Sequence, residues 1–114
     1  MSQKIPVLIL TVSALGAVSA HRFVGFDGAQ VSASGGKSLG VSTFDATDGQ
    51  DLALDVVGTT VVEAAGAIAV GADVVSDANG LAITNPGVGG EIVAAKALDS
   101  AAGAGEFIEV LLVQ

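Results

Sequence analysis

Few residues in this 114-residue sequence could do chemistry, and a serine motif is the first candidate. The segment Gly36-Lys37-Ser38-Leu39-Gly40 matches G-x-S-x-G, the pattern in which a serine nucleophile lies on a sharp turn between a strand and a helix. The residues that follow favour a strand instead, and the single histidine, His21, precedes the serine where that fold needs it afterwards. We interpret the segment as a turn with a solvated lysine; a hydrolase would require an activity that Ser38→Ala abolishes.

Acidic side chains are the second candidates. Asp77-Ala78-Asn79-Gly80 is similar to the middle of a calcium-binding loop, which places oxygen ligands just before a glycine. In that alignment Val75 and Pro86 occupy the first and last ligand positions, and neither side chain can bind a cation. We therefore predict a type I′ hairpin turn at Asn79-Gly80.

Composition excludes most of the remaining chemistry. The chain has no cysteine and one histidine, so we expect no disulfide, no thiol nucleophile, no metal site and no cofactor. Twelve Asp and Glu against four Lys and Arg give a net charge of -8, which argues against nucleic acid as a partner because phosphate backbones demand clustered cations. Carboxylate pairs such as Asp48 with Asp51 and Glu106 with Glu109 are interpreted as exposed turn residues, and we predict that the protein is not an enzyme.

The elements that would position these residues begin with an apolar segment, residues 1–20. Lys4 and the uncharged run 5–20 resemble a secretory signal, but the run has only 16 residues, and a membrane-spanning helix needs about 20. Its β-branched residues alternate instead, as in a strand, so we expect a retained opening strand or arm and no membrane partner. The alternative is a secreted or periplasmic β-domain for ligand binding or adhesion, released after Ala20; the amino-terminal residue of the native protein distinguishes the two.

Both faces of this opening strand are apolar until Thr11. We therefore predict that the strand is buried on both sides or covered by another subunit. Phe23 and Phe26 are expected to anchor the core or a subunit contact, because aromatic side chains bury the largest areas.

Turn signals divide the rest of the chain into short strands, and no linker is visible, so we predict one all-β domain over residues 1–114. We expect a single compact small β-barrel or sandwich with tight Gly-rich hairpins. Strands are predicted at 51–56 and 107–113, weaker ones at 59–62, 81–84 and 92–98, and a turn at Gly58. Residues 64–68 and 100–102 could each form a short helical turn.

A sequence pattern that occurs twice in the chain predicts an internal duplication. Phe44-Asp45-Ala46 with Gly49 matches Leu98-Asp99-Ser100 with Gly103, and each residue lies 54 positions from its match. Two similar β units that cannot each bury a face alone would pack together. Chance similarity in a sequence of low diversity is the alternative.

Charge is unevenly distributed: residues 1–37 carry a net +2 and residues 38–114 a net -10. One interpretation is that the acids cluster in solvated turns. The other is that the apolar, mildly basic opening docks on a partner while the acidic remainder faces solvent and discourages aggregation.

Taken together, these segments resemble the capsid cement, or head decoration, proteins of tailed bacteriophages. The resemblance extends along the chain and is carried by Val7-Leu8-Ile9-Leu10-Thr11-Val12, His21-Arg22-Phe23-Val24, Leu39-Gly40-Val41-Ser42, Asp45-Ala46-Thr47-Asp48-Gly49, Val62-Glu63-Ala64-Ala65-Gly66-Ala67-Ile68-Ala69-Val70-Gly71, Asp77-Ala78-Asn79-Gly80, Ala97-Leu98-Asp99-Ser100-Ala101-Ala102-Gly103 and Phe107-Ile108-Glu109-Val110-Leu111-Leu112.

The resemblance implies a compact, commonly trimeric β-protein on the capsid exterior of a virion. Such a protein binds the outer face of the shell and bridges neighbouring major capsid protein subunits, without catalysis. The partners expected are the major capsid protein and further copies of the chain, as a homotrimer. Our candidates for the capsid or subunit interface are Lys4, Ile5, Val7, Ile9, Arg22 and Phe23.

Overall fold

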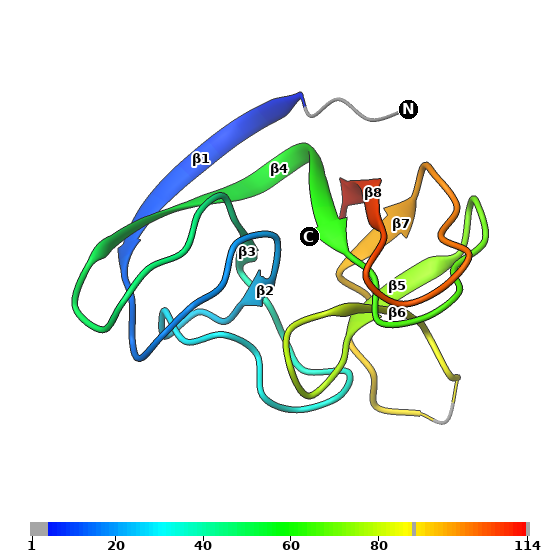
Figure 1. Cartoon of the computed structure of the whole chain (residues 1–114), viewed down its shortest axis with the longest axis horizontal. Coiled ribbons are helices and arrows are strands. Elements are labelled where there is room, and N and C mark those ends of the chain that lie inside the picture. Colours follow the sequence, from blue (N-terminus) through cyan, green and yellow to red (C-terminus); the bar gives the residue numbers. More distant parts are fainter. Residues whose placement is uncertain (1–4, 88, 114) are drawn as a thin grey trace.

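The protein is a nearly closed, barrel-shaped sheet of antiparallel strands (Figure 1). The computed structural model describes residues 5–87 and 89–113. The strands are β1 (Pro6–Ser13), β2 (Phe23–Val24), β3 (Gly40–Ser42), β4 (Asp51–Glu63), β5 (Asp73–Ser76), β6 (Ala82–Thr84), β7 (Ala95–Ala97) and β8 (Phe107–Leu112). They follow the order β2-β3-β4-β8-β7-β5-β6, and β1 pairs with β4 outside this path. The predicted all-β class is confirmed.

The described residues contain no helix that is long and apolar enough to span a membrane. The two predicted helical turns, 64–68 and 100–102, are wrong: both segments are bends. They are held to each other by a β-bridge between Ile68 and Ala101, so their backbone groups bond across the fold instead of along a helix.

Strand β4 organises the sheet. Its first half contains the predicted strand 51–56 with Leu52, Leu54 and Val56 buried, but Asp55 is buried as well, so burial does not simply alternate. The predicted turn at Gly58 is wrong, because β4 runs through this residue to Glu63. Gly58 has a φ of 105°, a conformation that bends the strand without ending it.

Two hydrophobic clusters flank the sheet. The smaller one collects Ala14, Val18, Val24, Ala46, Leu52, Leu54 and Val56 beside the first half of β4. The larger one fills the barrel between the second half of β4 and strands β5, β7 and β8, and it also takes in Phe23 from β2 and Val41 from β3. The barrel core is therefore built from both halves of the chain.

A turn, and not a strand pair, closes the barrel between β2 and β6. The Phe23 N–H donates to the Gly80 carbonyl (2.8 Å), and the Arg22 guanidinium donates to the Asn79 carbonyl (3.0 Å). The β5–β6 hairpin lies at the predicted place, but it is not type I′, because Asn79 does not have the positive φ which that type requires. Only Gly80 is left-handed (φ 76°), and the Asp77 carboxylate accepts the Asn79 N–H (2.8 Å) inside the turn.

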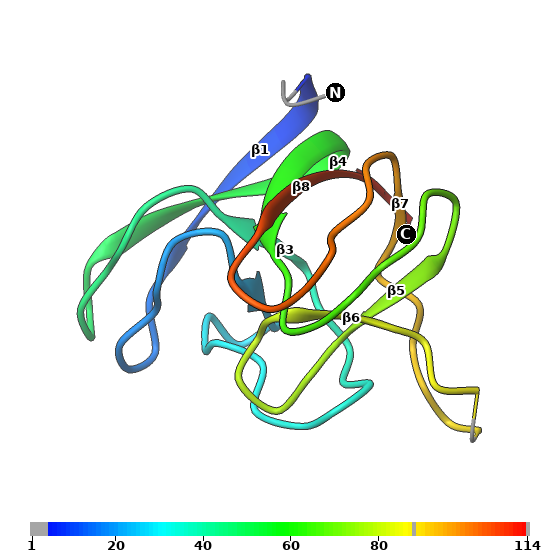
Figure 2. The same cartoon turned by 45° about the vertical axis from the view of Figure 1, so that its right-hand side comes forward.

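The two halves of the sheet repeat one pairing scheme, as the predicted duplication requires. β1 pairs with the first half of β4 as the second half of β4 pairs with β8, and β2–β3–β4 correspond to β5–β7–β8. We call the segment from β1 to Val57 the first unit and the segment from Gly58 to β8 the second unit. Figure 2 shows the two units side by side, joined by β4.

Loop bridges correct the alignment of the duplication. Val18 bridges Ala46 in the first unit, and Ile68 bridges Ala101 in the second. Ala46 therefore corresponds to Ala101, and the predicted match to Ser100 is wrong by one residue. The sequence match assumed a constant spacing, whereas the connections of the two units differ in length.

The bend at Gly58 generates a prediction. A Cβ atom at this position would collide with the Ile5 carbonyl oxygen, and the positive φ adds backbone strain. We expect Gly58→Ala to lower the free energy of unfolding by about 1–3 kcal/mol, measured by chemical denaturation. Gly66→Ala is the matched control, since that glycine has open space around it and no left-handed φ. Equal stability of the two variants would contradict this role for Gly58.

Candidate functional site

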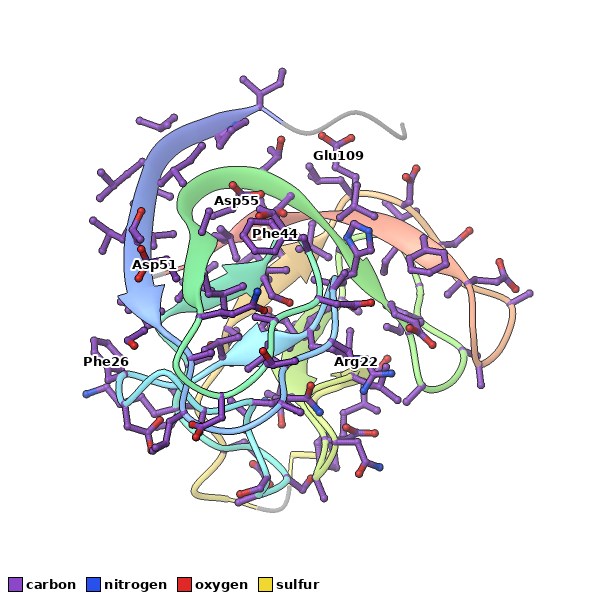
Figure 3. All side chains as sticks on the ribbon, turned by 60° about the vertical axis from the view of Figure 1, so that its left-hand side comes forward. Arg22, Phe26, Phe44, Asp51, Asp55 and Glu109 are labelled. Carbon is purple, nitrogen blue, oxygen red and sulfur yellow. The ribbon has the colours of Figure 1, made fainter. Side chains whose placement is uncertain are left out.

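The most unusual surface of the molecule is strand β1. Val7 is 75% exposed, Ile9 51%, Leu8 44% and Leu10 37%, so apolar side chains reach solvent on both faces of one strand. Figure 3 shows β1 along the border of the molecule, with side chains on both sides of its ribbon. The prediction that this strand is buried on both sides therefore fails within one chain, and cover by another subunit stays a prediction.

Strand pairing explains why β1 is uncovered. Within the described residues its one strand partner is β4, so its other edge has no neighbouring strand. Only the end of β1 reaches the body, where Val12 packs on the smaller cluster opposite Leu52. Towards Pro6 the strand extends past that cluster, and the even-numbered Leu8 and Leu10 lose their cover.

Charge does not protect this edge either. Natural proteins block exposed strand edges with charged side chains, prolines or bulges, because an open edge recruits other strands. The run from Ile5 to Ala20 contains no charged residue, and the features that could block the edge, Pro6 and the register shifts between Pro6 and Ile9, are confined to its start. Exposed apolar surface of this kind is typical of interaction sites, which makes β1 the candidate site.

The predicted interface residues do not form one group. Ile5, Val7 and Ile9 lie together on the exposed β1 segment. Lys4 lies outside the described residues. Arg22 lies beside the turn that closes the barrel between β2 and β6, and its guanidinium is 3.6 Å from the Glu63 carboxylate.

Phe23 is a correction to the predicted interface. Its side chain has no exposed surface, because β2 faces the barrel interior and Phe23 lies opposite Val41 in the larger cluster. It contributes to the core and cannot touch a partner in this structure. Phe26, in contrast, is 57% exposed, and the Lys37 ammonium lies 4.9 Å from its ring centre.

The side chains that could do chemistry have structural roles instead. The Asp48 carboxylate accepts the Gly16 N–H (2.9 Å), and the Glu106 carboxylate accepts the N–H groups of Ala102 and Gly103 (both 3.1 Å). His21 lies at a left-handed corner (φ 61°), with its Nδ1 3.2 Å from the Val61 carbonyl oxygen. No group of three or more His, Cys, Asp or Glu side chains suited to a metal occurs among the described residues.

Two carboxylates are buried, and the interpretation of Glu109 as an exposed turn residue is wrong. Asp55 lies inside the bend of β4 (Figure 3) and accepts a hydrogen bond from the Thr60 hydroxyl (2.7 Å), and Glu109 on β8 is only 4% exposed. The signal was present: each acid stands inside an apolar strand run, between large hydrophobic neighbours. The Asp55–Thr60 bond spans the bend at Gly58 and helps to fix its shape.

Comparison with known proteins gives the site its context. The family model described as phage cement protein matches residues 1–112. The chain belongs to the phage cement protein family. This places the chain among the virion-associated structural proteins of phages. No protein with a curated function matches it.

A solved structure shares the fold of this cement-family chain. It is described as the head fiber gp8.5 N base in bacteriophage phi29, and the TM-score is 0.75 at 16% sequence identity. The match covers 93% of this chain and 95% of that one. At this identity the likeness concerns the fold alone.

The two neighbouring phenylalanines give a test of the site assignment. Phe23→Ala should lower the free energy of unfolding by about 3–5 kcal/mol, because it opens a cavity in the barrel core. Phe26→Ala, the matched control, should cost less than about 1 kcal/mol, because most of its ring is already in water. Thermal or chemical unfolding of the cement protein measures both, and equal losses would show that Phe23 is not the core anchor.

Proposed function

We propose that this chain is a non-enzymatic structural protein that binds the outer surface of a phage capsid and cements adjacent major capsid protein subunits. We also propose that its working unit is a homotrimer. The observation that carries the proposal is the exposed apolar strand β1, which has a strand partner on one edge only, on a member of the cement family.

Cementing needs a contact surface and no chemistry. A protein that binds only the assembled shell stabilises it by RT ln(1 + [L]/Kd), about 2.7 kcal/mol at a hundredfold excess over Kd. Three linked copies add to this by avidity, since the second and third contacts form at a high effective concentration. The carboxylates of Asp48, Asp55 and Glu106 accept hydrogen bonds within turns and at the bend of β4. These structural roles agree with a protein that works by contact and not by catalysis.

The proposed interface is the opening segment with Lys4, Ile5, Val7 and Ile9; Arg22, beside the turn that closes the barrel, is proposed as a separate contact. Obligate protein interfaces are more apolar than ordinary surface and resemble a domain core cut in half. The segment around β1 has this character, whereas the acidic remainder of the chain keeps the particle surface soluble.

Shells of the phage that encodes this chain, prepared without it, allow a direct test. Added protein should bind the shells and raise the temperature at which they disrupt. The double variant Val7→Lys/Ile9→Lys should reduce shell occupancy by about tenfold or more, since two charges would have to be buried at the interface.

Ile92→Lys is the matched control, because Ile92 is a similarly exposed apolar residue outside β1. It should bind like the wild type, and circular dichroism should show that both variants are folded. Full occupancy by the β1 variant, or binding that leaves shell stability unchanged, contradicts the proposal.

Native mass spectrometry of the purified protein at micromolar concentration tests the homotrimer. We expect a trimer as the main species, because the exposed β1 strand would otherwise face water in every copy. A stable monomer under these conditions would contradict a trimer in solution.

A further inference from the structure

In the second unit, the strand that corresponds to β1 has both of its edges covered within the chain. β1 corresponds to the second half of β4, because the pair Ser13–Asp51 occupies the same place in the first unit as the pair Glu63–Phe107 in the second. Each of these strands has a long antiparallel partner on one edge. They differ in what lies on the other edge.

In the second unit, the first unit covers this other edge. The Glu63 N–H donates to the His21 carbonyl (3.1 Å), and the Thr59 N–H donates to the Ile5 carbonyl (3.1 Å). Between them the His21 ring nitrogen meets the Val61 carbonyl oxygen at 3.2 Å. A left-handed corner of one unit thus seals the strand edge of the next.

The second unit has the same corner at Gly71. His21 and Gly71 both adopt a positive φ, of 61° and 83°. The His21 N–H donates to Ser42 at the end of β3, and the Gly71 N–H donates to Ala97 at the end of β7. In the first unit the corner contacts β4, whereas at the Gly71 corner the neighbouring Val70 side chain is 66% exposed.

We propose that residues 69–72 of a second copy cover the free edge of β1, in the way that the His21 corner covers the free edge of β4. By this correspondence Thr11 and Ser13 stand for Val61 and Glu63, the two residues that the His21 corner contacts. Gly71 takes the place of His21, and the exposed Val70 next to it comes to lie close to Thr11. The inference specifies the subunit contact of the proposed homotrimer and rests on that part of the proposed function.

The shape of the molecule makes this contact intermolecular. β1 and the corner that precedes β5 lie on opposite sides of the molecule (Figures 1 and 2). Two different surfaces that meet head to tail generate a ring when the rotation closes, as in a trimer. Symmetric pairing of β1 with another β1 would instead give a two-fold dimer.

Engineered cysteines test the contact in the isolated protein, without any shell. The natural chain has no cysteine, so every disulfide reports the introduced pair. Under mild oxidation Thr11→Cys/Val70→Cys should give intermolecular products, up to a covalent trimer, at about tenfold the yield of either single variant. The matched control Thr11→Cys/Ile92→Cys should stay near the level of the single variants.

Dimers from Thr11→Cys alone would overturn the proposal in favour of β1-to-β1 pairing. Hydrogen exchange of wild-type protein supplies a second readout: residues 6–13 should be protected about tenfold or more at high protein concentration, and the protection should fall on dilution. Rapid exchange at all concentrations overturns the proposal and leaves β1 free for the shell. Protection without the Thr11–Val70 cross-link overturns the assignment of residues 69–72. Shell binding is measured separately, so a failure here is distinct from a failure of the cement function.

Discussion

The whole fold depends on one continuous strand that belongs to two units. The first half of β4 holds β1 on one edge and β3 on the other, and its second half holds β8. Gly58 allows the strand to bend between the halves, because its left-handed φ and missing side chain admit the Ile5 backbone. If β4 were broken at this residue, the two hydrophobic clusters would lose their common wall.

The two units differ in residue type at places that are buried in one unit and exposed in the other. The cross-strand pair Phe23–Val41 in the first unit lies in the barrel core. The pair at the same place in the second unit is Asp73–Lys96, an exposed ion pair 2.6 Å apart. The same place thus holds an aromatic core residue in one unit and an exposed, electrically neutral ion pair in the other, according to what covers it.

The sequence was informative where a local pattern determines structure. The alternation around Leu52 and Leu54 predicted β4, and the turn residues at Asn79-Gly80 predicted the β5–β6 hairpin. It was less informative where long-range packing decides. Gly58 has the local signature of a turn, and only its contact with Ile5 shows that the strand continues.

The candidate site shows the same division. The apolar character of β1 was visible in the sequence, but its exposure depends on how far the strand extends past the smaller cluster. Phe23 and Phe26 flank the same two residues and are chemically identical, so the sequence could not distinguish a core anchor from a surface ring. The pairing of Phe23 with Val41 places the Phe23 ring in the core, and this pairing is a property of the tertiary fold.

The β1–β4 ladder also has a mechanical consequence. The strands are antiparallel over Pro6–Ser13, and Pro6 lies at the end of the ladder opposite to the connection with the body. A pull on Pro6 along the strand axis loads the cross-strand hydrogen bonds together, in shear, and does not open them one after another. β1 is thus attached to the rest of the molecule in a geometry that resists tension.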